Sequence, residues 1–479
     1  MLHRITVIGG GPGGYAAAFD AAERGAEVTL IEKEAIGGTC LHNGCIPTKS
    51  FKASAEVLET ALSLSSFGIS LPVDCTPVVD MGAVVERKNR IRSTLQGGLE
   101  KTCENRSITL LYGCGRVVDA NTVEVTRQDG EGQSISSDSI ILATGSSVLE
   151  LPALLFDHKS IISSDDSLGL TKVPSSMLIV GGGVIGCELA FIYSQFGSKV
   201  TLVEGQDRLL PMPGVDDDSA RLIQRELKKR KVTCELGRTV SSVSVREDGS
   251  VKAVITVSPF IENPTPKQQK ESEIIMDTVV VCVGRTPNTN GLGLEDVGVE
   301  CDARGWILAD SQMRTNVPNI YAIGDVLGPA KVMLAHVASM EGLCAVQNCF
   351  GQEQVMDYTA VPSAVFTSPE LGTVGLTERE AEEAGYKPVS YTQQFRELGK
   401  AQAMGSLAGF FKLIADKATG KLLGAQLAGK HATDMISELT YALQQGGTVH
   451  QIAETIHAHP TLAEGIYEVA LHLSAKCEK

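Results

Sequence analysis

A G-x-G-x-x-G pattern occurs twice in this 479-residue chain and constrains its fold more than any other feature. Each copy follows a short apolar segment, precedes a run of small residues, and leads to a second apolar segment that ends in a glutamate. In both copies the glutamate comes 18 residues after the last glycine, and the copies are offset by 172 residues throughout. This order predicts two βαβ units of the kind that bind dinucleotides. The first contains Gly9, Gly11 and Gly14, strands Ile5–Ile8 and Val28–Glu32 and helix Tyr15–Glu23; the second contains Gly181, Gly183 and Gly186, strands Met177–Val180 and Val200–Glu204 and helix Cys187–Phe196.

The glycines and the acids have distinct physical roles in such a unit. Glycine lets the backbone approach a pyrophosphate closely, and the N-terminus of the following helix offers free N–H groups and a positive dipole. The acid at the end of the second strand, Glu32 or Glu204, accepts hydrogen bonds from ribose hydroxyls. A single copy of the pattern also occurs in ordinary tight turns, but two copies with the same strand, helix and acid spacing favour two dinucleotide sites.

Length and charge limit the remaining classes of protein. At about 100–200 residues per domain, the chain is long enough for three or four domains, and 43% hydrophobic residues is an ordinary globular composition. The net charge of −15 argues against a nucleic-acid partner. No apolar run reaches the roughly 20 residues that cross a bilayer, and the N-terminus enters the first strand without a signal-peptide pattern. We therefore expect an α/β protein in the cytoplasm, with neither a nucleic-acid nor a membrane partner.

The rest of the chain alternates between helix and strand patterns. We expect two long helices after the first unit, the second with its charged residues on the exposed side, and later a polar, proline-containing hairpin loop. From Thr359 the pattern changes to that of a separate α+β domain. The expected elements are helices Pro47–Ser63 and Met81–Glu104 with charges at Glu86, Arg87, Lys88, Arg90 and Arg92, the loop Asn263–Glu273, C-terminal strands Ala364–Phe366, Gly409–Ala415 and Leu422–Leu427, and C-terminal helices Thr377–Ala384, Ala432–Gln444 and Leu462–Ser474.

Two of the twelve cysteines, Cys40 and Cys45, form a close pair just downstream of the first unit. Cys45 comes two residues before Pro47, a residue favoured in the first turn of a helix. A helix N-terminus stabilises a thiolate and lowers the pKa of the thiol, as an exchangeable redox pair requires. Taken alone, the spacing also suits two inert thiols or half of a metal site. No second cysteine pair or histidine cluster completes a tetrahedral zinc site, so we predict no metal.

With this motif the sequence resembles the flavoprotein disulfide reductases, a family with two dinucleotide domains. The segment Gly37–Lys49 is similar to the family motif G-G-T-C-L-x-x-G-C-I-P-x-K, and the resemblance covers essentially the whole chain. Within the family, the chain is most similar to the dihydrolipoamide dehydrogenases. The other matching segments are Ala143–Gly145, Val283–Asn288, Tyr321–Asp325, Leu334–His336, Glu341–Gly342, Pro369–Glu370, Val374–Glu378 and His457–Glu464.

The resemblance implies two cofactors, FAD on the first unit and NAD on the second. It also implies that Cys40 exchanges with the substrate, that Cys45 lies against the flavin, and that Lys49 and Glu188 form an ion pair near it. The expected FAD residues are Gly9, Gly11, Gly14, Glu32, Lys49, Thr144, Gly145, Asp325, Ala335 and His336; the expected NAD residues are Gly181, Gly183, Gly186, Glu188, Glu204 and Gly284. The expected domains are an FAD domain in two parts, 1–149 and 278–350, an NAD domain, 150–277, and a dimerisation domain, 351–479.

A general base is implied as well, some 400 residues after the cysteines. Thiol–disulfide exchange needs a thiolate attacker, and a histidine with a pKa near 6.5 is suited to generate it. His459 matches the base of the family, and Glu464 matches the acid that orients it. His457 shares a side with His459 if the segment is extended, although an ordinary surface histidine is the alternative for His457. In the family this base reaches the active site of the other subunit, so we expect a homodimer.

The expected activity is therefore dihydrolipoyl dehydrogenation with NAD⁺, on a dithiol that is free or attached to a lipoyl carrier of a multienzyme complex. Glutathione reductases have two lysines after the Cys-Val-Pro that contains their second redox cysteine. They also use arginines to hold the 2′-phosphate of NADP. This chain has Thr48-Lys49 and Glu204 instead, while Arg208 leaves some NADPH use open. Mercuric reductases end in a vicinal cysteine pair, where this chain has only Cys477. A flavin-bound redox sensor or structural subunit is the remaining alternative.

Overall fold

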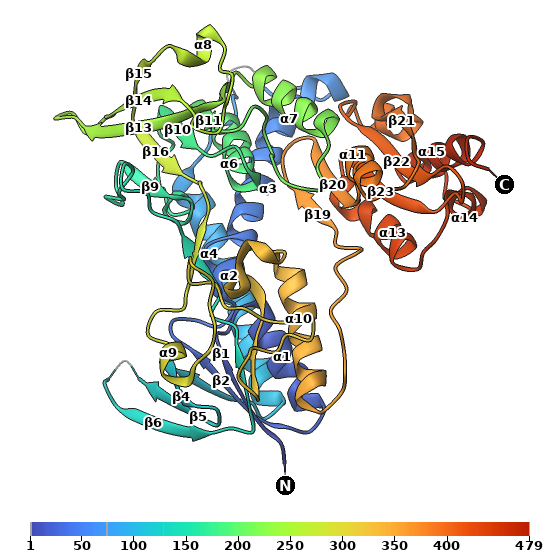
Figure 1. The fold of residues 1–479 in the computed structure, drawn as a ribbon. Coiled ribbons are helices and arrows are strands. Elements are labelled where there is room, and N and C mark those ends of the chain that lie inside the picture. The colour runs from blue at the N-terminus through green and yellow to red at the C-terminus, as the bar shows by residue number, and fades with distance from the viewer. Residues whose placement is uncertain (1, 73–74, 128, 479) are drawn as a thin grey trace.

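The computed structural model describes residues 2–72, 75–127 and 129–478 (Figure 1). It places two parallel sheets one above the other, with the C-terminal segments beside them. Over the described residues, no helix combines the length and the apolar character that crossing a membrane requires. The fold is the expected α/β architecture, with two dinucleotide-binding units and a C-terminal α+β domain.

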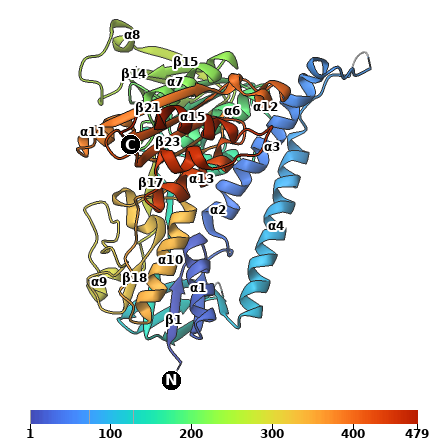
Figure 2. The same cartoon turned by 90° about the vertical axis from the view of Figure 1, so that its right-hand side faces the viewer.

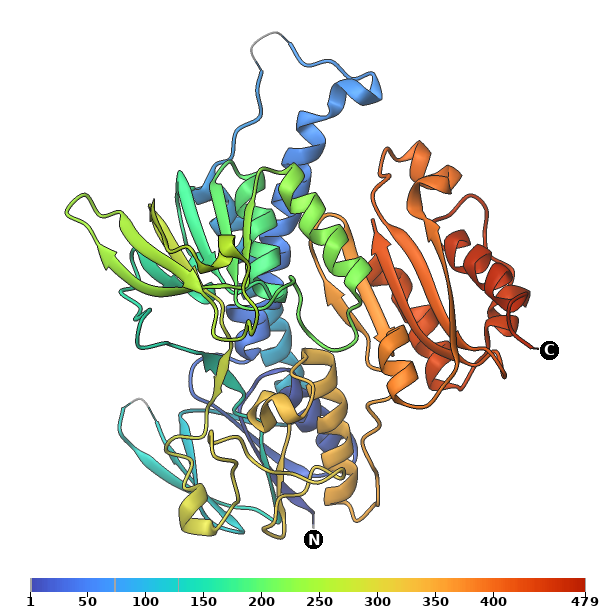
Figure 3. The same ribbon diagram turned by 45° about the horizontal axis from the view of Figure 1, so that its top comes forward.

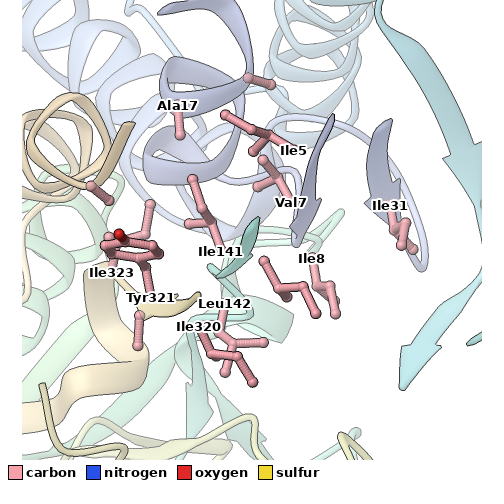
Figure 4. Close-up of a cluster of buried hydrophobic side chains, with 14 of the residues drawn as sticks. Ile5, Val7, Ile8, Ala17, Ile31, Ile141, Leu142, Ile320, Tyr321 and Ile323 are labelled. Carbon is pink, nitrogen blue, oxygen red and sulfur yellow. The ribbon is translucent and has the colours of Figure 1, made fainter. Parts of the chain in front are cut away.

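The first glycine-rich unit lies at the centre of a five-stranded parallel sheet in the order β18-β7-β1-β2-β3. Strands β7 and β18 are buried along their whole length, as a parallel sheet covered by helices requires. Helices α1 and α10 pack against each other, and Figure 4 shows apolar side chains that pack between α1 and the sheet. The bounds are β1 Arg4–Ile8, α1 Pro12–Glu23, β2 Glu27–Glu32, β3 Thr109–Tyr112, β7 Ser139–Leu142, β18 Ile320–Ala322 and α10 Ala335–Cys349.

The second unit repeats this arrangement in a parallel sheet with the order β12-β11-β10-β16-β9. Strand β16 corrects one expected domain boundary, because the division between residues 277 and 278 is wrong. β16 is fully buried and pairs with β10 and β9, so it completes the second sheet rather than beginning a new domain. The bounds are β9 Ile161–Ser163, β10 Ser176–Val180, α6 Val184–Gln195, β11 Lys199–Glu204, α7 Asp217–Lys229, β12 Thr233–Leu236 and β16 Thr278–Val281.

Smaller antiparallel sheets extend the two units. A ribbon of β8 and β17 forms where the chain crosses between the units, as the resemblance implied. The expected loop Asn263–Glu273 is partly wrong, since it contains helix α8, which Thr265 caps, and the start of β15. The bounds are β4 Cys114–Asp119, β5 Thr122–Thr126, β6 Gly132–Ser136, β8 Ser146–Val148, α5 Ser164–Ser167, β13 Arg238–Val245, β14 Val251–Val257, α8 Pro266–Gln269, β15 Ser272–Met276, β17 Arg285–Pro287, α9 Leu294–Val297 and η2 Gly324–Ala330.

Helices α3 and α4 pack side by side along one edge of the molecule (Figure 2). They confirm the two long helices expected after the first unit, but the exposed position expected for Lys88 is wrong. Lys88 is 7% exposed, because its ammonium donates a hydrogen bond to the backbone oxygen of Leu168 at 2.9 Å. The bounds are α2 Gly38–His42, α3 Cys45–Leu62, η1 Leu64–Phe67 and α4 Met81–Asn105.

The C-terminal part is an antiparallel sheet in the order β19-β20-β23-β22-β21 with its own apolar core (Figure 3). Helix α13 packs against β20 and β23, and α15 packs against β21 and β22. The bounds are β19 Ser363–Val365, β20 Glu370–Gly375, α11 Glu378–Glu383, β21 Pro388–Gln394, η3 Phe395–Glu397, α12 Gly399–Ala403, β22 Phe410–Asp416, β23 Leu422–Gly429, α13 Ala432–Gln444, α14 Val449–Glu454 and α15 Glu464–Ser474.

Candidate active site

The two cysteines of the redox motif meet at the junction of α2 and α3. Cys40 lies in α2, which ends at His42, and Cys45 is the first residue of α3. Gly37 permits the turn into α2, because its φ of +117° lies in the left-handed region that favours glycine. Both thiols are free and half-buried, and each one shifts the pKa of the other. The sequence therefore predicted correctly that the two sulfurs come together at a helix start.

The two thiols differ in acidity. The hydrogen bond from Cys40 and the positive charge of Lys49 outweigh the effect of burial and lower the pKa of Cys45 to about 7. The hydrogen bond to Cys45 and burial raise the pKa of Cys40. The two shifts are opposite in direction, so Cys45 is the more acidic sulfur of the pair. This division of roles suits thiol–disulfide exchange, in which one sulfur is attacked and the other leaves as a thiolate.

An ion pair lies one helical turn further along α3. The Lys49 ammonium is 2.9 Å and 3.1 Å from the two carboxylate oxygens of Glu188 on α6, as the resemblance implied. Glu188 is 3% exposed on its side chain and also accepts a hydrogen bond from the backbone N–H of Phe366 at 2.9 Å. Sequence reasoning did not single out Phe366, because this contact joins residues that are 178 positions apart.

The acids of the two dinucleotide units are held in the same way. The N–H of Gly10 donates to Glu32 at 2.7 Å, and the N–H of Gly182 donates to Glu204 at 2.6 Å. In each unit the other carboxylate oxygen accepts from the backbone N–H two residues further on, at 2.9 Å and 2.7 Å. Each oxygen keeps a second lone pair, so both carboxylates are fixed and can still accept a hydrogen bond from a ribose hydroxyl.

The glycines of the two units also match in geometry. Gly9 and Gly181 have φ of +108° and +107°. A Cβ atom would lie 1.8 Å from the Gly9 oxygen if placed on Gly14, and 1.9 Å from the Gly181 oxygen if placed on Gly186. Each helix can therefore approach its strand only with glycine at this position. The N-cap positions of α1 and α6 are occupied by the middle glycines, Gly11 and Gly183.

Polar groups gather where β7 and β18 end, on the carboxyl side of the first sheet. Thr144 Oγ1 is buried and has no hydrogen-bond partner among the described residues, and Gly145 follows it with a positive φ. The Ser146 hydroxyl donates to Asp325 at 2.8 Å and accepts from Arg285 at 2.6 Å. Sequence reasoning named Asp325 but missed Ser146 and Arg285, although both lie in or beside the crossover segments that it had identified.

Three further residues predicted to bind the cofactors lie at the start of α10 and in the crossover segment. Ala335 begins α10, and the next residue, His336, donates from Nε2 to the backbone oxygen of Pro362 at 3.0 Å. That nitrogen is therefore used within the chain, and burial lowers the pKa of the ring. Gly284 has φ of +135°, and its oxygen accepts from the N–H of Leu149 at 3.0 Å, which fixes the crossover.

These groups fit the implied cofactors. The unpartnered Thr144 hydroxyl, the glycine-lined start of α1 and the carboxylate of Glu32 are the donors and acceptors that an FAD needs. The start of α6 and the carboxylate of Glu204 offer the same set to a second dinucleotide. Within the described ranges, no three His, Cys, Asp or Glu side chains are grouped so as to hold a metal ion.

A histidine–glutamate pair lies on the outer surface of the C-terminal part. His459 Nδ1 is 2.7 Å from Glu464, whose other oxygen accepts from the N–H of Thr461 at 2.8 Å. The hydrogen bond from His459 lowers the pKa of Glu464, so the acid is ionised and Nδ1 carries the proton. Nε2 of a side chain that is 80% exposed then remains as a base. In Figure 1 the flanking helices α14 and α15 lie at the far edge from α2, so one chain does not bring this pair to its own cysteines.

His457 does not lie on the side of His459, and its buried side chain does not fit the alternative of an ordinary surface histidine either. Its side chain is 7% exposed, with Nε2 2.9 Å from Glu438 on α13 and Nδ1 2.9 Å from the backbone oxygen of Thr455. These two partners turn the ring inward, whereas His459 points to solvent.

Two dinucleotide folds joined to a dithiol with one acidic sulfur define a nucleotide-linked disulfide oxidoreductase. The chain belongs to the pyridine nucleotide-disulphide oxidoreductase family, whose model matches residues 3–342. The model of the family's dimerisation domain matches residues 361–470.

The chain is also similar over nearly its full length to two dihydrolipoyl dehydrogenases and to one solved structure. Dihydrolipoyl dehydrogenase of Haloferax volcanii is 40% identical over 469 residues, which is 97% of this chain and 95% of the relative. Dihydrolipoyl dehydrogenase of Chlamydia muridarum is 41% identical with the same coverage of both chains. The crystal structure of LpdA from Mycobacterium tuberculosis has a TM-score of 0.89 at 26% identity, and the match covers 98% of this chain and 100% of that one.

Proposed function

We propose that the chain catalyses the dihydrolipoyl dehydrogenase reaction, the oxidation of dihydrolipoamide to lipoamide with NAD⁺ as acceptor. The observation that carries the proposal is the placement of Cys40 and Cys45 at the junction of α2 and α3, one helical turn from the Lys49–Glu188 ion pair and in a chain with two dinucleotide units. Relatives at 40% and 41% identity over 97% of the chain support the choice of substrate.

The proposed cofactor residues are those expected from the sequence. FAD is held by Gly9, Gly11, Gly14, Glu32, Lys49, Thr144, Gly145, Asp325, Ala335 and His336, and NAD⁺ by Gly181, Gly183, Gly186, Glu188, Glu204 and Gly284. A flavin bound there would supply the acceptor for the electron pair of the dithiol and the hydride donor for NAD⁺. The chain itself supplies alignment, charge and proton transfer.

The protein's own steps begin with the oxidised pair, in which Cys40 and Cys45 are joined. His459 Nε2 takes a proton from one substrate thiol, and the resulting thiolate attacks the sulfur of Cys40. The Cys40–Cys45 bond breaks, and Cys45 leaves as a thiolate beside the Lys49 ammonium, which favours that charge. The second substrate thiol then attacks the mixed disulfide, and Cys40 leaves and takes up the proton. Lipoamide is released, and the pair is reduced by two electrons.

Contacts at the end of β11 support NAD⁺ rather than NADP⁺ as acceptor. Glu204 would repel a 2′-phosphate. The nearby Arg208 has the charge that attracts a phosphate, but its guanidinium donates to Asp217 at 2.9 Å and to the backbone oxygen of Val215 at 2.9 Å. The arginine is therefore held by the chain's own acceptors.

An assay with three substrate pairs tests the proposal. The holoenzyme is supplied with dihydrolipoamide and NAD⁺, with glutathione disulfide and NADPH, or with Hg²⁺ and NADPH. We expect turnover with the first pair. Turnover with either of the others and none with the first would assign the chain to another branch of the family. A chain that NADH cannot reduce at all under anaerobic conditions would instead be a sensor or structural subunit.

The partners follow from the same proposal. The dimerisation domain supports a homodimer, in which the exposed His459 of one chain serves the cysteines of the other. We propose that the dithiol is presented on a lipoyl carrier domain of a multienzyme complex and that the enzyme works in the cytoplasm. Co-purification of the tagged chain with a lipoylated protein, detected by an anti-lipoyl antibody, tests the carrier; fractionation of cells tests the location.

A further inference from the structure

Phe366 reaches from the C-terminal sheet to both charges of the ion pair beside Cys45. It lies in the loop between β19 and β20, and its ring centroid is 4.3 Å from the Lys49 ammonium. Its backbone N–H donates to Glu188 at 2.9 Å. Phe366, in a loop of the C-terminal sheet, thus contacts the Lys49 cation through its ring and the Glu188 anion through its backbone.

The ring contact restricts a side chain that would otherwise be mobile. The Lys49 side chain is 31% exposed, and a lysine has a long flexible stem that loses entropy when its ammonium is held in one place. The negative face of an aromatic ring attracts an ammonium within about 6 Å, most strongly where water is partly excluded. The ring of Phe366 therefore favours the lysine conformation that is paired with Glu188.

The loop that carries Phe366 is itself fixed to α3 and to α13. Glu370, at the start of β20, accepts from the Lys52 ammonium at 2.6 Å and from the Thr433 hydroxyl at 2.7 Å. Lys52 lies on α3, the helix that begins at Cys45, and Thr433 lies in the first turn of α13. The ring is thus held at a defined place over the redox helix.

We propose that Phe366 is a positioning residue of the redox centre. It holds the ammonium of Lys49, a residue one helical turn from Cys45 on α3, in its pair with Glu188. The inference rests on the proposed redox role of the cysteine pair. Four groups face Cys45: Cys40 from α2, Lys49 from α3, Glu188 from α6 and Tyr15 from α1. Phe366 contacts the two that carry full charges. The C-terminal domain thereby supports the thiolate of its own chain, in addition to presenting His459 outward.

Three variants of the FAD-loaded holoenzyme test the role. Phe366→Leu removes the ring, Phe366→Tyr keeps the ring face, and Phe260→Leu is a matched control at a phenylalanine that is 68% exposed on the second unit. Each protein is reduced anaerobically by two electrons and titrated with pH. The absorbance of the charge-transfer band between the Cys45 thiolate and the flavin reports the fraction of thiolate. Melting temperature and flavin content are measured for each variant in parallel.

We expect the midpoint of this band to move up by about half a pH unit in Phe366→Leu, because the loss of the cation–π contact with Lys49 weakens the field at the thiolate. We expect Phe366→Tyr and Phe260→Leu to keep the midpoint of the unaltered enzyme. An unchanged midpoint in a folded Phe366→Leu enzyme would overturn the inference alone. Absence of the band in the unaltered enzyme would overturn the proposed function. If Phe366→Leu fails to fold, pentafluorophenylalanine at position 366 keeps the size of the ring and removes its negative face, and the same midpoint shift is then required.

Discussion

At the scale of single residues, the reaction depends on where two protons reside. One is on Cys40, which leaves Cys45 as the thiolate, and the other is on Nδ1 of His459, which leaves Nε2 as a base. The first proton is placed by the interaction between the two thiols, and the second by the Glu464 carboxylate, which is 2.7 Å from His459 Nδ1. Substitutions that move either proton therefore affect one half of the reaction more than the other.

Replacing His459 by Gln separates the two halves of the reaction. One half is the exchange between the substrate dithiol and the cysteine pair, and the other is electron transfer between the flavin and the nicotinamide. We expect dihydrolipoamide turnover to fall by about 100-fold or more, because the substrate thiol loses its base. Reduction of the bound flavin by NADH, followed by stopped-flow, should remain within a few-fold of the unaltered rate, since no substrate thiol is involved. His472→Gln, on the same domain, is the control and should change neither rate. Equal losses in both halves for His459→Gln would contradict its role as the base.

Local spacing predicted the residues whose neighbours are close in sequence. The glycines, the two acids and the cysteine pair all lie within short segments whose chemistry is readable from the order of residues. Phe366 and Ser146 escaped notice because their partners are 178 and 179 positions away, and no pattern in the sequence records such a contact. Lys88 was misplaced for the same reason, since its acceptor, Leu168, lies 80 positions away on another part of the chain.

At the scale of elements, the two dinucleotide units are internal copies that can be altered separately. Each depends on a glycine whose Cβ would collide with the backbone of the preceding turn. The same substitution in the two units should therefore give the same local damage with different functional loss.

We expect Gly14→Ala to lower the flavin content of the purified protein sharply, because α1 must move away from its strand. Gly186→Ala should keep the flavin but weaken NADH binding about tenfold or more, measured as the NADH concentration that half-saturates flavin reduction. Gly97→Ala in α4, where a Cβ meets no neighbour within 4 Å, is the control and should keep both ligands. Loss of flavin in Gly186→Ala would show that the units do not act separately.

A charge cluster around the buried side chain of Lys412 joins the C-terminal sheet to the second unit. Lys412 on β22 is 7% exposed on its side chain and lies 2.9 Å from Asp216, at the start of α7, and 2.8 Å from Glu378 on α11. Lys412→Met should destabilise the protein by about 3–5 kcal/mol, since it leaves two acids unpaired. Lys252→Met, which removes an exposed pair with Glu273, should cost about 1 kcal/mol or less. Apparent melting temperatures of the two holoenzymes at matched concentration decide between these outcomes.

The same cluster gives stability a defined dependence on pH. Lys412 holds the pKa of Glu378 below its usual value, so the folded state binds this proton less readily than the unfolded state. The contribution is present above the unfolded pKa, about 4.3, and is lost as pH falls through the lower folded value. The difference in melting temperature between the unaltered chain and Lys412→Met should therefore shrink on acidification below about pH 4. A difference that grows on acidification would contradict this account.

At the scale of the whole molecule, the distance between His459 and the cysteines makes activity a property of two chains. Cys45→Ser chains lack a working redox pair, and His459→Gln chains lack a base. If the base acts across the dimer, a mixed dimer of these two inactive variants contains one site with both groups intact. After unfolding and refolding of an equal mixture, we expect about one quarter of the unaltered activity, because half the dimers are mixed and each has one working site. No recovery would place the base in its own chain's site.

Because of its strand order, the first sheet is completed later during synthesis than the second sheet, although its first strands are made earlier. All five strands of the second sheet lie between residues 161 and 281, whereas the first sheet needs β18, residues 320–322, to cover the edge of β7. At about 5–20 residues per second, the ribosome takes roughly ten to forty seconds to travel from β7 to β18. During that time the apolar edge strand Ser139–Leu142 stays open to other chains. The first sheet, although begun first, thus closes after the second sheet, and until then its exposed edge makes the nascent chain prone to aggregate.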